Sequence, residues 1–133
     1  MNGAAVKAYS KAKDGNKSLS ANFKVREFAC KDGSDVIFIS DGLVQVLQAI
    51  RSHFNAAVTI NSGYRTPAYN KKVGGETYSQ HLYGTAADFV VKGVSPKDVA
   101  AYAEMLLPNT GGIGIYGTFT HVDVRKVKSR WKG

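Results

Sequence analysis

The chain has 133 residues, 44% of them hydrophobic and 21% charged, and this composition excludes an intrinsically disordered protein. Its 18 basic and 10 acidic residues give a formal net charge of +8, which favours anionic partners such as nucleic acid, anionic lipid or cell-wall polymers. A single cysteine, Cys30, excludes an internal disulfide, and we expect it to be a small buried residue.

The first part of the chain, residues 1–20, is rich in Lys, Ser, Ala, Gly and Asn and shows no hydrophobic periodicity. We therefore expect a flexible tail or linker there and a folded domain over residues 21–133, beginning close to Phe23. The N-terminal residues lack the apolar run of a secretory signal, and no stretch approaches the roughly 20 apolar residues that span a bilayer. We expect no signal peptide and no membrane span.

The first predicted helix follows Ser40 and Asp41, either of which can cap it. Its apolar side chains recur at positions i, i+3, i+4 and i+7 and form one stripe, made of Leu43, Val46, Leu47 and Ile50. A strand is predicted next, over residues 56–61, because small, β-branched and polar residues alternate there.

The middle of the chain continues this alternation of helix and strand. Thr66 and Pro67 predict the start of a short helix, which ends at residues 72–75. Residues 86–91 read AADFVV and predict a central strand that is apolar on both faces. Another helix is predicted to begin at Ser95 and to stop at Pro108.

The last predicted elements are two strands, residues 113–116 and 119–124, joined by a hairpin turn at residues 117–118. Helices before and between strands, followed by an antiparallel hairpin, predict a single domain of the α+β class.

Three histidines are candidates for chemistry: His53, His81 and His121. His53 lies on a charged helix, and we interpret it as a surface residue. His81 is followed seven positions later by Asp88, and Gly84 between them lets the backbone bend without a Cβ penalty. Two histidines and one carboxylate are a ligand set typical of catalytic zinc, although the spacing alone leaves the metal unproven.

The segment SQHLYGTAAD, residues 79–88, resembles the S-x-H-x-x-G-x-A-x-D signature of the M15 zinc peptidases. This group contains D-alanyl-D-alanine carboxypeptidases and L-alanyl-D-glutamate endopeptidases. Two further segments resemble the family in the same order, SGYRTPAYN at residues 62–70 and GGIGIYGTFTHVDV at residues 111–124. The resemblance covers about residues 23–131.

The resemblance implies that His81, Asp88 and His121 bind one Zn²⁺, within a small central antiparallel sheet covered by helices, as in hedgehog-like and D-Ala-D-Ala peptidase folds. It also places Arg65 on the substrate side, where an arginine holds a peptide carbonyl or carboxylate; the alternative for Arg65 is a structural salt bridge. Ser79 is expected either to support the neighbouring ligand or to contact substrate.

The chain departs from the family pattern at the residue expected to take a proton. Better-known members have an acidic residue three positions before the last histidine, where this chain has Thr118. Asp123 is the nearest acidic residue that could replace it. Side chains two residues apart on a strand point to the same face, so Asp123 and His121 are expected to lie on one face. We predict that Asp123 acts as the general base, with orientation of His121 as the alternative role.

The resemblance implies a zinc-dependent peptidase that hydrolyses peptidoglycan stem peptides, as a D,D-carboxypeptidase or as an L,D-endopeptidase. The alternative is a catalytically inactive, zinc-containing module that binds the anionic cell wall. The basic ending RKVKSRWKG also suggests a nucleic-acid binder, but no nucleic-acid motif supports specific binding, and Arg130 and Trp131 can instead pack the last segment onto the domain. We expect a monomer that acts on the cell wall, either as a phage or prophage lysin delivered by another route or as a domain of a larger exported hydrolase.

Overall fold

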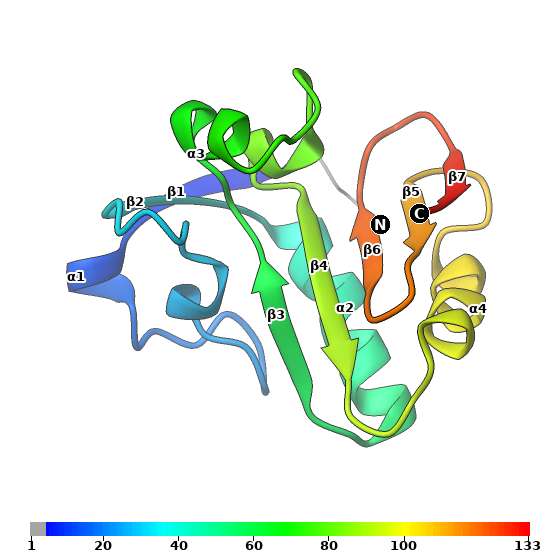
Figure 1. The fold of residues 1–133 in the computed structure, drawn as a ribbon. Helices are drawn as coiled ribbons and strands as arrows, with labels where there is room; N and C mark the ends of the chain where they lie inside the picture. Colours follow the sequence, from blue (N-terminus) through cyan, green and yellow to red (C-terminus); the bar gives the residue numbers. More distant parts are fainter. Residues whose placement is uncertain (1–4) are drawn as a thin grey trace.

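The computed structural model describes residues 5–133, and these residues form two sheets and four α-helices (Figure 1). The strands are β1 (Val6–Ser10), β2 (Val36–Ser40), β3 (Val58–Ser62), β4 (Ala86–Val91), β5 (Gly112–Ile115), β6 (Thr120–Asp123) and β7 (Ser129–Lys132). The helices are α1 (Lys11–Asp14), α2 (Asp41–Phe54), α3 (Pro67–Lys72) and α4 (Pro96–Leu106), with 3₁₀ helices η1 (Val25–Phe28) and η2 (Gln80–Tyr83). The α+β prediction is confirmed.

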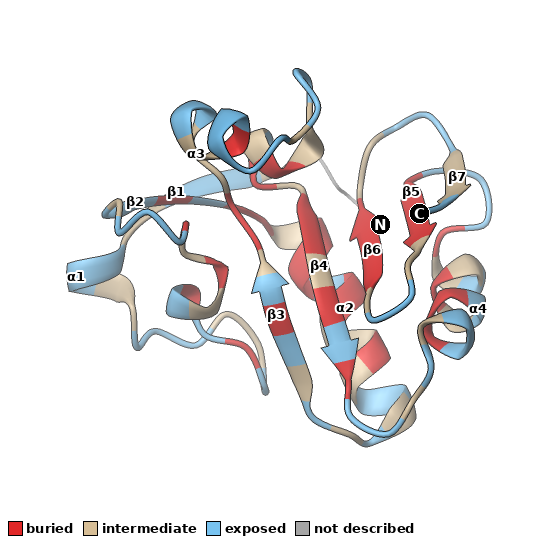
Figure 2. Ribbon diagram, viewed as in Figure 1, coloured by how far each residue is buried: buried red, intermediate tan, exposed pale blue. Residues whose placement is uncertain are grey.

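The larger sheet has the strand order β3-β4-β6-β5-β7. Its strands pair antiparallel, except that β7 joins the edge of β5 in parallel. The predicted strands at residues 86–91 and the closing hairpin are therefore confirmed, and β4 and β6 occupy the interior of the sheet. Figure 2 shows that β6 is buried along its whole length, as expected for a strand with neighbours on both sides.

Helix α2 supplies one side of the hydrophobic core. The Ser40 hydroxyl caps it by accepting a hydrogen bond from the Leu43 amide, and Asn55 ends it in the left-handed conformation. The predicted apolar stripe is fully buried, and it packs in one cluster with side chains of the large sheet, among them Phe89, Val91 and Val122. Because successive strand residues alternate faces, Phe89 and Val91 point into this core while Asp88 points to the opposite face.

The expectation of a flexible tail over residues 1–20 is wrong for the described part of that segment. Strand β1 pairs antiparallel with β2 in a separate two-stranded sheet, which the sequence did not predict. Asp35 accepts hydrogen bonds from the Ser10 hydroxyl at 2.7 Å and from the Ala12 amide at 2.8 Å, and these bonds fix the start of α1. Strands β1 and β2 pair across a separation of 30 residues, as at Ala8 and Phe38. Such a pairing leaves no periodic pattern within the N-terminal segment, so its composition does not reveal the strand. Residues 1–4 lie outside the described residues.

The basic C-terminal segment packs onto the domain, as its Arg130-Trp131 ending suggested. It forms β7, and the Arg130 guanidinium donates hydrogen bonds to Glu104 on α4 and to the Gly111 carbonyl. Trp131 Nε1 donates to the Tyr116 hydroxyl at 2.8 Å. Within residues 5–133, no helix is long and apolar enough to cross a membrane.

Two single-residue predictions concern positions outside the candidate site. Cys30 is buried, with 3% of its surface exposed, as predicted. His53 is exposed and stacks on Tyr102 of α4, with ring centroids 3.7 Å apart, so it is a surface histidine as interpreted.

Candidate metal centre

One row of residues crosses all five strands of the large sheet and places most of the candidate centre. From β3 to β7, directly paired positions in this row are Ser62, Asp88, His121, Gly114 and Trp131. Asp88 and His121 are therefore cross-strand neighbours on β4 and β6, and paired residues of this kind have side chains close enough to bond. The antiparallel register alone brings together two residues that are 33 positions apart in sequence.

His81 reaches this row from the 3₁₀ helix η2, not from a strand. The Ser79 hydroxyl caps η2 by accepting a hydrogen bond from the His81 amide at 3.2 Å. Gly84 ends η2 with φ of +73°, and a Cβ there would lie 2.2 Å from the Phe38 carbonyl oxygen. The predicted bend at Gly84 is thus required both by backbone conformation and by close packing against β2.

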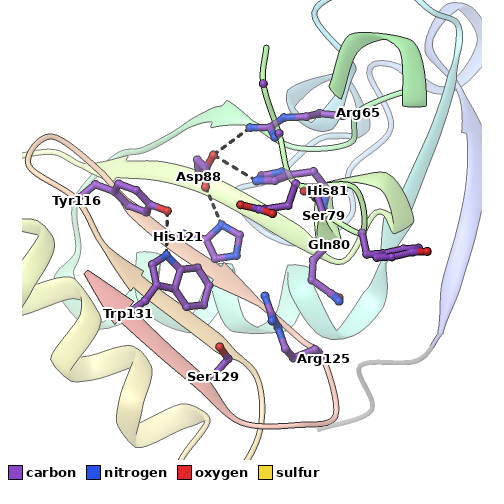
Figure 3. A pocket seen from close by; sticks show the side chains of 14 residues that line it. Arg65, Ser79, Gln80, His81, Asp88, Tyr116, His121, Arg125, Ser129 and Trp131 are labelled. Atoms are coloured by element: carbon purple, nitrogen blue, oxygen red, sulfur yellow. Dashed lines mark hydrogen bonds and ion pairs between the residues drawn. The ribbon is translucent and has the colours of Figure 1, made fainter. Parts of the chain in front are cut away.

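The side chains of His81, Asp88 and His121 converge, with one potential ligand atom of each within 4.8 Å of the others (Figure 3). His81 Nε2 lies 3.2 Å from Asp88 Oδ2, and His121 Nδ1 lies 2.8 Å from Asp88 Oδ1. Both histidines are buried, whereas the Asp88 side chain is 14% exposed. The three residues singled out in the sequence as zinc ligands are therefore brought together.

The second nitrogen of each imidazole ring has a hydrogen-bond partner behind the centre. His81 Nδ1 donates to the Gly63 carbonyl at 2.7 Å, so that Nε2 is the nitrogen turned to Asp88. His121 Nε2 lies 2.8 Å from Asp123 Oδ2, so that Nδ1 is turned to Asp88. Metal-binding histidines are typically held this way, by a carbonyl or a carboxylate on the nitrogen that does not bind metal. The donor set therefore fits a zinc ion.

The charges around His121 are strongly coupled. Burial disfavours the charged forms of His121, Asp88 and Asp123, but hydrogen bonds and neighbouring opposite charges together outweigh burial in all three cases. Bonds to Asp123 and Asp88 raise the pKa of His121 above its ordinary value. Bonds from His121 and His81 lower the pKa of Asp88 below its usual range, and bonds from Arg125 and His121 do the same for the pKa of Asp123. Both aspartates are therefore carboxylates at neutral pH.

Asp123 lies behind His121 with 0% of its side chain exposed. Its two oxygens accept hydrogen bonds from the Gly112 amide at 2.9 Å and from the Arg125 amide, Nε and Nη2 at 3.2, 2.8 and 2.7 Å, in addition to the contact with His121. A carboxylate enclosed in this way does not suit the predicted role of a general base acting on water. Its placement suits the alternative role, orientation of His121.

Arg65 lies at the other side of the centre, and each of its three nitrogens has a partner. Nε donates to the Ser62 hydroxyl at 3.0 Å, Nη1 to Asn70 Oδ1 at 3.2 Å and Nη2 to Asp88 Oδ2 at 3.4 Å. The structural salt bridge considered for Arg65 is thus present. Arg65 also lines the pocket described below, so a contact with substrate is open to it as well.

A pocket of about 610 Å³ opens over the three converging residues. Its wall includes Arg65 and Ser79, both of which the sequence singled out. It also includes four residues that the sequence did not single out for the site: Glu76, Tyr116, Arg125 and Trp131. The Arg-Trp ending was a signal for Trp131 as a packing residue, but nothing in the sequence indicated that it lines the pocket. Thr118, at the position of the usual family base, is exposed in the turn between β5 and β6 and is not part of the wall.

A sequence model of the peptidase M15 family matches residues 19–123. The chain belongs to peptidase family M15. The matched range contains all three converging residues and Asp123, and it ends before Arg125 and Trp131. The chain is also similar to a protein of Haemophilus influenzae named "Probable peptidoglycan L,D-endopeptidase MepK", with 37% identity over 86 residues. That match covers 59% of this chain and 45% of the relative, so the chain corresponds to less than half of the relative's length.

Proposed function

We propose that the chain is a zinc-dependent peptidase that hydrolyses peptide bonds of bacterial peptidoglycan, with His81, Asp88 and His121 as the ligands of one Zn²⁺. The observation that carries this proposal is the convergence of three donor groups at one pocket, with both rings fixed from behind by Gly63 and Asp123. Membership in the M15 family and the name of the Haemophilus relative support the same assignment.

A zinc ion held there would supply two kinds of chemistry: it would polarise a scissile carbonyl as a Lewis acid, and it would lower the pKa of water. The protein supplies the remaining requirements. Asp123 and the Gly63 carbonyl hold the two imidazole rings in the tautomers that leave one nitrogen free for metal. Arg65 lies beside Asp88 at the pocket wall, where its guanidinium can stabilise negative charge that develops on a carbonyl oxygen.

Asp123 is proposed as a positioning residue, although the sequence predicted it as a general base. Its contact with His121 is 2.8 Å, and its other hydrogen bonds leave no oxygen open to the pocket. Ser79 is proposed to support His81, because its hydroxyl is already used by the His81 amide. Arg65 and Ser79 both line the pocket, so contacts with substrate remain part of the proposal.

The substrate is proposed to be the stem peptide of peptidoglycan. The relative's name favours cleavage as an L,D-endopeptidase over removal of a terminal D-alanine. The net charge of +8 is suited to an anionic cell wall, and we infer that the chain acts there as a monomer. Delivery as a phage or prophage lysin, or as a domain of a larger exported hydrolase, belongs to the same proposal.

The decisive experiment is elemental analysis of zinc in the purified protein, combined with hydrolysis of stem peptides. We expect about one zinc per chain in the wild type and loss of both zinc and hydrolysis in His81→Ala and Asp88→Ala. His53→Ala is the matched control, because it removes a histidine that stacks on Tyr102 outside the site, and it should keep both. Full hydrolysis by His81→Ala would contradict the proposal.

A second candidate function is a zinc-containing module that binds the cell wall without hydrolysis. Two observations favour it: Thr118 replaces the usual acidic residue, and Asp123 is enclosed. Co-sedimentation with purified peptidoglycan, followed by chromatography of the released products, separates the two candidates. Binding by the zinc-loaded wild type without any soluble product would favour the binding module.

A further inference from the structure

We propose that Arg125 binds a carboxylate group of the substrate, on the side of the metal centre opposite to Arg65. This inference rests on the proposed function, because it assumes that peptides enter the pocket above the three ligand residues. It adds a substrate class to that function: peptides that carry a free carboxylate near the scissile bond.

The first observation is the open edge of the Arg125 guanidinium. Nε and Nη2 donate to the two oxygens of Asp123 at 2.8 and 2.7 Å, which is a bidentate pairing along one edge. Among residues 5–133, no hydrogen bond is made by Nη1. The edge formed by Nη1 and Nη2 therefore offers two parallel N–H donors, and the side chain that carries it is 31% exposed and lines the pocket.

The second observation is that this open edge is held rigidly. Asp123 is fully buried and fixed by the Gly112 amide, so it anchors the guanidinium from behind. Arg125 Cζ also lies 5.4 Å from the centre of the Trp131 ring, whose Nε1 donates to the Tyr116 hydroxyl. An arginine held between an ion pair and an aromatic ring loses little further entropy when it binds a ligand, which favours a recognition role.

Arg65 does not offer the same opportunity. All three of its nitrogens have protein partners, and its side chain is 15% exposed, about half the value for Arg125. Figure 3 shows Arg65 and Arg125 on opposite sides of His81, Asp88 and His121. A peptide lying across the centre would therefore have the engaged arginine at one side and the arginine with an open edge at the other.

The balance of charge favours an anionic group over a neutral carbonyl at this edge. The charged residues at the pocket wall are Arg65, Arg125, Asp88 and Glu76, with Asp123 directly behind. With His81 and His121 neutral as ligands of Zn²⁺, these two positive and three negative side-chain charges and the ion would sum to +1. A planar carboxylate matches the two parallel donors of the open edge in both shape and charge.

The test uses stem peptides in which each carboxyl group is, one at a time, either free or converted to a primary amide. We expect zinc-loaded wild type to prefer the free carboxylate at one position by about 10- to 100-fold in kcat/KM. Arg125→Gln should bring this preference close to 1, mainly through KM, and Arg125→Lys should retain part of it because it keeps the charge without the bidentate edge. Arg51→Gln, which removes the same charge from α2, should keep the full preference.

The preference ratio is an internal control for damage to the site. Arg125→Gln also removes donors from Asp123, but the resulting loss in zinc affinity or rate affects acid and amide substrates equally. Equal use of acid and amide by the wild type, or an unchanged ratio in Arg125→Gln, would overturn the inference. If zinc-loaded wild type hydrolyses none of the peptides, the proposed function fails instead. Calorimetric Kd values for the same acid and amide pairs then decide the inference by the same ratio.

Discussion

Asp88 and Asp123 are hydrogen-bonded to the two different nitrogens of the His121 ring. Asp88 and Asp123 each lie 2.8 Å from His121, and each is also paired with an arginine, Arg65 and Arg125 respectively. They differ in access, because Asp88 lines the pocket with 14% of its side chain exposed and Asp123 is enclosed with 0% exposed. The residue type and its distance from the histidine are therefore the same in both cases, and exposure to the pocket separates the candidate ligand from the residue proposed to position His121.

The surroundings on β5 explain the difference. Asp123 is paired with Gly112, and a Cβ at Gly112 would lie 2.2 Å from Asp123 Oδ2. Because Gly112 has no side chain, the Asp123 carboxylate has room to lie behind His121. Asp88 is paired with Ser62 and His121, and its oxygens are turned to the pocket. The pKa of both aspartates lies below its usual range, so charge state does not distinguish their roles.

The largest effect is expected at the aspartate that faces the pocket. Asp88→Asn replaces a charged ligand by a weak neutral one, and we expect loss of zinc and a fall of hydrolysis to the background rate. Zinc titration monitored by calorimetry, with peptide hydrolysis measured on the same samples, checks this. If Asp88→Asn retained wild-type zinc affinity, the assignment of Asp88 as a ligand would be wrong.

A smaller effect on zinc is expected at the enclosed aspartate. Asp123→Asn keeps the shape of the side chain but weakens the hold on His121, and we expect zinc affinity to fall by about 10- to 100-fold. Because the ligands themselves remain, excess zinc should restore most of the hydrolysis. A variant with normal zinc affinity and a rate that no zinc concentration restores would instead support the general-base role.

The space beside Asp123 provides a test at Gly112 that leaves all charges in place. Gly112→Ala introduces a methyl group against a buried carboxylate, and we expect a loss of about 1 to 3 kcal/mol in the free energy of unfolding together with weaker zinc binding. Gly117→Ala is the matched control on the next turn, where no atom lies within 4 Å of the added Cβ. Chemical denaturation of the two zinc-free variants measures the difference. Equal stabilities would show that the Gly112 cavity does not position Asp123.

The parts predictable from sequence are those with a local pattern. The stripe of α2 repeats within eight residues, and the metal motif places His81, Gly84 and Asp88 within one ten-residue segment. The pairing of β1 with β2 depends on contacts between distant segments, and for that reason residues 5–20 resembled a tail. The sequence left the role of Asp123 open. Its two-residue spacing from His121 predicts that both side chains lie on the same face of a strand, but it does not predict which residue of the neighbouring strand Asp123 is paired with.

The pocket wall shows the same limit. Arg125 and Trp131 meet because β7 joins β5 in parallel with Trp131 beside Gly114, where the ring occupies the space of the missing side chain. That register is set by packing of the whole sheet and has no local signature. The basic ending was visible as charge, but its contribution to the pocket wall became visible only in the three-dimensional arrangement.

The smallest effect is expected from a change at Ser79, next to the centre at His81. The His81 ring is hydrogen-bonded to the Gly63 carbonyl and not to a carboxylate. Ser79→Ala removes the hydroxyl that accepts from the His81 amide, and we expect a loss of about 0.5 to 1 kcal/mol in unfolding free energy with slightly weaker zinc binding. Ser95→Ala removes the equivalent cap of α4, where the hydroxyl accepts from the Asp98 amide, and should lower stability without changing zinc affinity. Thermal denaturation and zinc titration of both variants separate the two effects. If Ser79→Ala leaves zinc affinity unchanged but raises KM, then Ser79 contacts substrate, and the support of His81 rests on η2 and the Gly63 carbonyl alone.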